Sequence, residues 1–164
     1  MDNRKHQPLV DPLSRLDGLT NCWDAKDKRE RTPLHCAVLH GDREAIKALL
    51  FTFEFQRDQA QLTAFDYAVM GGQVETMRMF VEDFNMPSYT QDLKTRTLQC
   101  AAFSGKLEAL EYLQDELSFD LKATDRRSGR TALHWAVEGD QEDMVLALLK
   151  MNHVGPSLLE KVEV

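Results

Sequence analysis

Apolar residues recur along this chain at helical spacing, in short segments separated by polar turns. Ala45-Ile46 and Leu49-Leu50 lie one helical turn apart, and Met144-Val145 with Leu148-Leu149 repeat that arrangement near the other end. This period places the apolar residues on one side of a helix. A shorter amphipathic segment precedes each pair, with the sequence TPLHCA in one case and TALHWA in the other. The pattern therefore predicts pairs of short helices, each with one apolar side.

The six-residue pattern occurs four times. TPLHCA begins at Thr32 and TALHWA at Thr131, and the weaker copies TAFDYA and RTLQCA begin at Thr63 and Arg96, so successive copies are 31, 33 and 35 residues apart. A period near 33 residues with the signature T-P-L-H-x-A is that of ankyrin repeats, which this chain resembles over nearly all of its length. The resemblance implies an all-α repeat fold, an ankyrin-repeat solenoid of stacked helix-turn-helix units with β-turn fingers.

Each copy has the signals that start and stop two helices. Thr32 is a good N-cap, and Pro33 suits the first helical position because its missing N–H has no helical partner there. Small residues at the sixth position of each copy allow helices to approach closely, and the third residue of each copy is expected in the core. A left-handed residue is expected to end the first helices, and an acid is expected in the first turn of the second helices, near the positive end of the helix dipole. These four sets are Ala37, Ala68, Ala101 and Ala136; Leu34, Phe65, Leu98 and Leu133; Gly41, Gly72, Gly105 and Asp140; and Glu44, Glu75, Glu108 and Asp143.

The register of the copies divides the chain into six segments. Residues 1–31 form an N-terminal extension with a degenerate capping half-repeat, whose second helix is expected around Leu13 to Leu19, and the first finger. Terminal repeats are expected to be atypical because one face must meet water. The four repeats occupy 32–62, 63–95, 96–130 and 131–154, and residues 155–164 are a short C-terminal cap or tail.

The fingers between repeats have an aspartate near a fixed position. Asp27 and Asp58 stand five residues before the first residue of the following copy, and Gln91, with Asp92 beside it, holds the third place. Asp125 stands six residues before Thr131, so the fourth finger is predicted to be one residue longer than the others. That residue explains the 35-residue spacing.

Composition limits the class of protein. The chain has 164 residues, of which 43% are hydrophobic and 29% charged, which predicts one soluble domain. No apolar stretch is long enough to span a membrane, so a cytoplasmic or nuclear location is expected. The net charge of −7 disfavours direct nucleic-acid binding, which needs clustered cations. Three cysteines without C-x-x-C spacing, Cys22, Cys36 and Cys100, predict mostly buried thiols.

The histidines favour a structural role over catalysis. His35 and His134 occupy the motif's own histidine position, where the ankyrin resemblance implies that the imidazole bonds backbone groups across neighbouring repeats. No cysteine or carboxylate accompanies them at the spacing of a metal site or a catalytic triad, and no phosphate-binding loop is present. We therefore expect no enzyme activity, no metal and no cofactor.

Binding of another protein remains, and the repeat register indicates where. The last turns of the first helices should face the concave groove, with large apolar residues at three of the four positions, and exposed apolar rows mark interfaces. The alternative is that the short helices rotate and bury these residues. Trp135, Tyr67, Cys36 and Cys100 hold a position that is usually core. The groove candidates are Leu39, His40, Met70, Phe103 and Glu138.

Two basic clusters lie on fingers. Lys28 and Arg29 belong to the first finger, and Arg126 and Arg127 to the fourth. The functional interpretation is contact with an acidic partner, and the alternative is an ordinary solvated turn, which loop tips usually are.

The fourth copy carries a narrower resemblance. The run Ser128–Glu138, SGRTALHWAVE, follows the lengthened finger, and Asp140 stands where the other copies have glycine. Both departures are similar to a late repeat of the inhibitor-of-kappa-B family. The resemblance implies a monomeric inhibitor that binds a Rel/NF-kappa-B transcription factor and suppresses its activity.

Residues outside the repeats refine that expectation. Ser14 is the one serine before residue 32, and no acidic tail follows Gly155, whereas cellular members of the family have a paired-serine degradation signal and an acidic tail. The chain thus resembles short polydnavirus ankyrin proteins, which implies host immune suppression without signal-induced degradation. The alternative is a generic ankyrin adaptor or scaffold that recruits another protein, with an unassigned role for the terminal Val162-Glu163-Val164.

Overall fold

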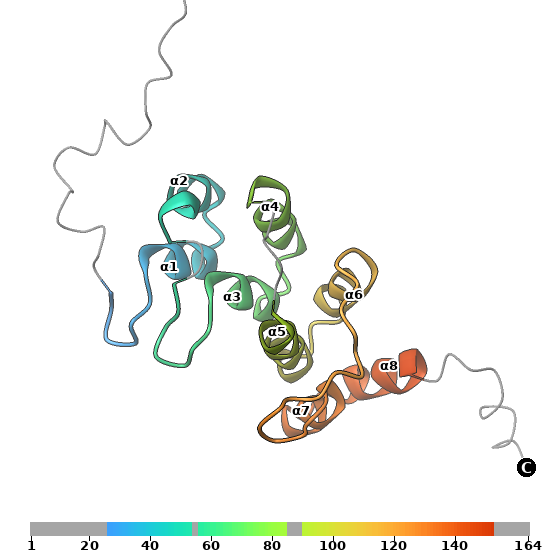
Figure 1. Ribbon diagram of the computed structural model, residues 1–164. Helices are drawn as coiled ribbons and strands as arrows, with labels where there is room; N and C mark the ends of the chain where they lie inside the picture. Colours follow the sequence, from blue (N-terminus) through green and yellow to red (C-terminus); the bar gives the residue numbers. More distant parts are fainter. Residues whose placement is uncertain (1–25, 54–55, 85–89, 153–164) are drawn as a thin grey trace, which may run out of the picture. The chain divides into compact units, whose positions relative to one another are not determined.

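The computed structural model describes residues 26–53, 56–84 and 90–152. These residues form helices and turns, with a single isolated antiparallel bridge between Arg57 and Thr63, so the prediction of an all-α repeat is confirmed. The expected capping helix around Leu13 to Leu19, Cys22 and the tail 155–164 lie outside the described residues. The helices (Figure 1) are α1 (Pro33–His40), α2 (Arg43–Phe53), α3 (Ala64–Met70), α4 (Val74–Phe84), α5 (Gln91–Ser104), α6 (Leu107–Asp115), α7 (Ala132–Glu138) and α8 (Glu142–Asn152).

The helices belong to two compact units, which divide between Ala64 and Phe65. The first contains α1, α2 and the turn that leads to α3. The second contains α4 to α8 and nearly all of α3. α1 packs on α2 in the first unit, and α7 packs on α8 in the second, where α5 packs on both α6 and α7.

The first helices begin where the motif predicts. Thr32 and Thr131 are the N-caps of α1 and α7, and Pro33 occupies the first turn of α1. The histidine three residues on completes each cap, because the backbone N–H of Thr32 donates to Nδ1 of His35 at 3.1 Å and that of Thr131 to Nδ1 of His134 at 3.2 Å. Histidine thus takes the place that glutamate or glutamine has in the usual capping box.

The ends of the first helices also agree with the sequence. The first or second residue after each of these helices has a positive φ, which glycine adopts without steric cost and aspartate tolerates better than most residues. In the last repeat Asp140 takes this conformation at φ +54°. The acids predicted for the second helices do lie in their first turns. The glycines are Gly41, Gly72 and Gly105, at φ +69°, +66° and +68°.

The core consists of the apolar sides of the helix pairs. The motif alanines are all buried, and so are the motif's third residues except Leu133, which is half-buried. In the second unit the rings of Phe65 and Phe80 meet edge to face with 5.7 Å between centroids, an arrangement that aromatic pairs favour. Cys36 and Cys100 are half-buried, so the prediction of mostly buried thiols is only partly met.

Three of the fingers are closed by the same kind of backbone hydrogen bond, and the loop it closes has one of two lengths. The N–H of the aspartate donates to the carbonyl four residues later in two of them, from Asp27 to Arg31 at 3.1 Å and from Asp58 to Leu62 at 2.9 Å. In the fourth finger the bond runs five residues, from Asp125 to Arg130, at 2.8 Å. The predicted extra residue is therefore inside this loop.

The prediction of a third finger is wrong. Gln91 and Asp92, expected in a β-turn, are the first residues of α5, which has 14 residues and begins well before the motif. Thr90 is the N-cap, and its hydroxyl accepts from the N–H of Leu93 at 3.4 Å. The helix starts there because a capping threonine precedes Gln91, while the motif's own cap position holds Arg96.

The motif's fourth position makes two different links to the following repeat. Nδ1 of His35 accepts a hydrogen bond, so its proton is on Nε2, which donates to the carbonyl of Leu62 at 3.1 Å. In the second unit the equivalent residue, Asp66, accepts from the hydroxyl of Thr97 at 2.7 Å. The link between Asp66 and Thr97 is buried, and that between His35 and Leu62 is partly buried. The expectation that His134 bonds backbone across repeats is not met within the described residues, where its exposed ring caps its own helix.

Candidate protein-binding surface

The residues predicted for the groove differ in exposure. Leu39, at the end of α1, is 46% exposed, and Phe103, at the end of α5, is 45% exposed. Met70 is half-buried at the end of α3, so the packing alternative applies to it in part. His40 and Glu138 are exposed. Leu39 and His40 lie in the first unit, and Met70, Phe103 and Glu138 lie in the second.

The ends of α5 and α7 touch through their backbones. A Cβ atom on Gly139 would lie 2.3 Å from the carbonyl oxygen of Phe103, closer than any side-chain carbon can approach. Glycine at 139 therefore allows the two helix ends to meet. It brings the backbone of Phe103 close to Gly139, the residue after Glu138, in the second unit.

Arg130 organises the charged part of this surface. Its guanidinium lies 5.2 Å from the centre of the Trp135 ring and forms an ion pair with Glu138. The cation over the aromatic face is favourable, and the ion pair compensates the negative charge of Glu138. The indole N–H of Trp135 is buried and has no hydrogen-bond partner within the described residues. Trp135 is half-buried, so the core position expected for it is only partly met.

The fourth finger presents cations from a fixed turn. Arg126 pairs with Asp92 of α5 at 3.2 Å, and both side chains are largely exposed, so the pair adds little stability. The turn is held by Asp125, which accepts from the N–H of Arg127 at 3.0 Å and from the hydroxyl of Ser128 at 2.7 Å. The bond from the N–H of Arg127, followed by that from Ser128, lowers the pKa of Asp125. Arg127 is exposed at the tip.

The first finger has the same design. Lys28 and Arg29 are exposed, and Asp27 accepts hydrogen bonds from the side chain and the N–H of Arg31. These bonds, with the side chain of Arg31 as the strongest cause, lower the pKa of Asp27 to about 2. The carbonyl of Arg29 accepts from the N–H of Gln59 at 2.9 Å, so the first two fingers lie side by side in the first unit.

His40 is held in one orientation. Its Nδ1 lies 2.7 Å from the carbonyl oxygen of Cys36. A carbonyl only accepts, so the proton is on Nδ1 and the exposed Nε2 of the neutral ring is left as an acceptor. A partner with an N–H or O–H donor could bond to this atom.

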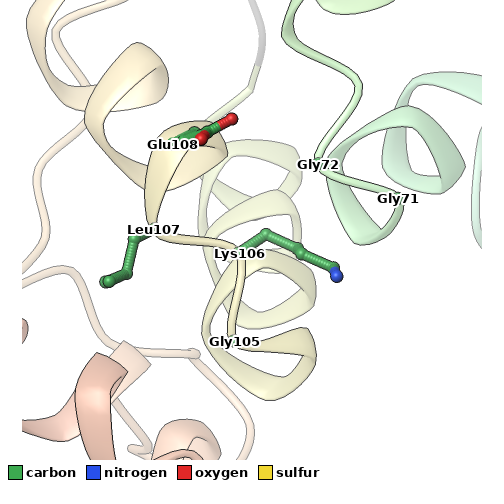
Figure 2. A pocket seen from close by; sticks show the side chains of 6 residues that line it. All are labelled: Gly71, Gly72, Gly105, Lys106, Leu107 and Glu108. Carbon is green, nitrogen blue, oxygen red and sulfur yellow. The ribbon is translucent and has the colours of Figure 1, made fainter.

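Sequence reasoning missed a shallow cavity of about 320 Å³ in the second unit. It lies between the α3–α4 turn and the α5–α6 turn, and in Figure 2 the Lys106 side chain extends across it toward the α3–α4 turn. The adjacent glycines before α4 were the signal for an open space. Its lining residues are Gly71, Gly72, Gly105, Lys106, Leu107 and Glu108.

The described residues hold neither a metal-binding cluster nor a membrane-spanning helix. No group of three or more histidine, cysteine, aspartate or glutamate side chains in these ranges could hold a metal ion. None of the helices described has the length and apolar character needed to cross a membrane.

Comparison with known proteins agrees with the repeat pattern. A family model described as "Ankyrin repeats (3 copies)" matches residues 3–91 and 85–158. A curated relative, the NF-kappa-B inhibitor cactus of Drosophila yakuba, is 26% identical over 128 residues, which are 77% of this chain. The chain spans about a quarter of the length of that relative, 25%.

Proposed function

We propose that this chain, which belongs to the ankyrin-repeat family and is a protein-interaction module, binds a transcription factor of the Rel/NF-kappa-B class. By binding it, the chain suppresses the activity of the transcription factor. The observation that carries the proposal is the similarity to the NF-kappa-B inhibitor cactus. The longer loop of the fourth finger, Asp125 to Arg130, and the aspartate at 140 are two departures from the generic repeat that agree with it.

The contact residues proposed are those at the ends of the first helices, considered in each unit by itself. Leu39 and Phe103 offer exposed apolar area, and Met70 offers part of its side chain. Apolar anchors of this kind carry much of the binding free energy of protein interfaces. Glu138, His40 and the fingers supply polar contacts around them. Bound there as a monomer, in the cytoplasm or nucleus, the chain would occupy protein surface that the transcription factor needs.

The arginines of the fourth finger are proposed to speed association with an acidic region of the partner. Charges at the rim of an interface act mainly on the association rate and on its salt dependence. Arg126 and Arg127 are exposed and sit on a turn that Asp125 holds. Replacing both by glutamate should therefore slow association without unfolding the repeats.

The direct test is coexpression with an insect or vertebrate Rel factor. We expect lower DNA binding by the factor and lower reporter output. Phe103→Asp should weaken the complex by at least about tenfold, as loss of an interface anchor does, with helix content unchanged. Arg126→Glu with Arg127→Glu should slow association and reduce its salt dependence.

The matched control carries the same charge change elsewhere. Arg43→Glu with Lys47→Glu alters two exposed side chains of α2 and should leave association unchanged. Full Rel activity in the presence of excess folded chain would refute the proposal and favour a generic adaptor. The level of the chain after an immune stimulus tests a further part of the proposal, that it is not degraded on signalling.

A further inference from the structure

The last described repeat leaves uncovered a position that every earlier repeat buries. Val38, Val69 and Ala102, equivalent residues of the first three repeats, are each 0% exposed. The fourth residue in this register, Val137 at the end of α7, is 63% exposed. Within the second unit, Val69 and Ala102 are each followed by another described repeat, whereas none of the described residues after α8 forms one. Val137 thus lies at a position that is buried in the earlier repeats and exposed here.

A second residue on the same helix pair breaks the pattern in the opposite way. Leu146 of α8 is 54% exposed. The equivalent positions in α2, α4 and α6 hold charged residues: Lys47 and Glu111 are exposed, and Arg78 is half-buried with its guanidinium over the ring of Tyr112 in α6. The leucine departs from this pattern, because its three counterparts are all charged.

Leu146, Leu149 and Val137 belong to one helical hairpin. Met144 and Leu148 are fully buried, so the side of α8 opposite them carries Leu146 and, 38% exposed, Leu149. A short turn connects α8 to the end of α7, where Val137 lies. We call Val137, Leu146 and Leu149 the terminal face. They are three of the five large hydrophobic residues exposed within the described ranges.

The charge at the start of α8 is negative, while Lys150, exposed one turn after Leu146, is positive. Asp140, Glu142 and Asp143 are exposed where α7 turns into α8, and within the described residues none of them forms an ion pair. The acids at the start of α8 also favour the helix dipole. The interaction with the helix dipole explains why these residues are negatively charged. It does not explain the exposed leucine one turn later.

From this combination we propose that the terminal face binds a basic, apolar segment of a partner protein. Leucine-like side chains of the segment would cover Leu146, Leu149 and Val137, and its lysines or arginines would face Asp140, Glu142 and Asp143. The chain's own residues 153–164 have the wrong charge, with Glu160 and Glu163 against Lys161. The surface is distinct from the groove residues, so the inference stands apart from the identity of a Rel partner.

The probe for the test is a synthetic amphipathic peptide of leucine and lysine, added to the full chain. Its counterpart, in which glutamate replaces lysine, controls for apolar attraction alone. We expect the lysine peptide to shift the methyl resonances of Val137, Leu146 and Leu149, and the glutamate peptide to leave them unchanged.

Two variants separate the apolar from the charged contribution. Leu146→Lys restores the kind of residue that the other repeats hold and should weaken binding by at least about tenfold, as loss of an anchor does. Ala48→Lys adds the same charge at an exposed position of α2 and should have little effect on the affinity for the peptide. The double variant Glu142→Gln with Asp143→Asn should remove most of the salt dependence of peptide binding. Its control, Glu108→Gln with Glu111→Gln on α6, should leave that salt dependence unchanged. All four should melt within a few degrees of the parent chain.

Three results would overturn the inference. One is equal affinity of the parent chain and Leu146→Lys for the lysine peptide. Another is peptide binding that begins only after residues 153–164 are deleted, because the chain would then cover its own face. The third is a dimer in sedimentation that Leu146→Lys abolishes, because a second copy would then be the occupant.

Discussion

Repeats 1 and 4 carry the two best copies of the motif and place them in different surroundings. His35 is 0% exposed, caps α1 and donates from Nε2 to the carbonyl of Leu62. His134 makes the same cap, yet its ring is exposed. The comparison separates two roles of one histidine. The cap is local and follows from the motif, whereas the link between repeats needs a following finger.

The fingers of the two repeats differ in a related way. Each has a residue with positive φ near its end, Glu30 at +60° in the first finger and Gly129 at +67° in the fourth. The longer loop of the fourth finger uses the residue type that adopts this conformation freely, while the first finger uses one that does not. The first finger compensates with the bonds from Arg31 to Asp27.

The largest contrast should come from the motif leucines. Leu34→Ala removes a side chain that is 0% exposed and should lower the free energy of unfolding by roughly 2 to 5 kcal/mol. Leu133→Ala acts on a half-buried residue and should cost about half as much or less. Urea unfolding of both variants measures this. Equal losses would mean that the last repeat is as tightly packed as the first.

The histidines should follow in size. His35→Ala leaves the buried N–H of Thr32 without its partner and breaks the bond to Leu62, so we expect a loss of roughly 2 to 4 kcal/mol. His134→Ala removes an exposed cap and should cost about 1 kcal/mol. Thermal melts of the two variants provide the comparison. A loss from His134→Ala as large as that from His35→Ala would contradict the separation of cap and link.

Substitutions in the finger turns should change the free energy of unfolding by smaller amounts and in opposite directions. Gly129→Ala forces a Cβ into the left-handed region and should destabilise by about 1 to 2 kcal/mol, although the space around it is open. Glu30→Gly relieves the same conformation in the first finger and should stabilise by up to about 1 kcal/mol. Denaturant midpoints of the two variants decide the signs. Destabilisation by Glu30→Gly would show that the glutamate side chain matters more than its backbone.

The acid response of the first finger should be the smallest effect. The folded pKa of Asp27 is about 2, below its ordinary value of 3.8, so its contribution to stability is complete above about pH 4. That contribution should disappear as the pH falls from about 4 to about 2. Carboxyl chemical shifts followed by NMR give the pKa directly. Asp27→Asn should remove this part of the pH dependence, and an ordinary pKa for Asp27 would mean that the bonds from Arg31 are weak in solution.

Much of the fold was predictable because its determinants are local. An N-cap threonine, a proline in the first turn and a left-handed residue at the helix end each act within a few residues, so Thr32, Pro33 and Asp140 were placed correctly from sequence. The one-residue extension of the fourth finger was also predictable, since Asp125 fixed one end of the loop and the motif fixed the other.

The predictions were wrong where packing against another helix, or a second possible N-cap, determines the structure. The third finger was expected at Gln91, but Thr90 offers an earlier N-cap than the motif does, and α5 starts there. The exposure of Phe103 and the partial burial of Met70 depend on packing between helices, which the register alone does not give. The contact of Gly139 with the backbone of Phe103 joins two repeats and has no local signature.

The two links at the motif's fourth position place different constraints on how the sequence can evolve. His35 donates to a main-chain carbonyl, which every residue type supplies, so position 62 can change its side chain without losing the bond. Asp66 instead accepts a hydrogen bond from the hydroxyl of Thr97, so this link needs a particular side chain at both positions. Among relatives of this chain, residues 66 and 97 should therefore change together, while residue 62 should drift independently of residue 35.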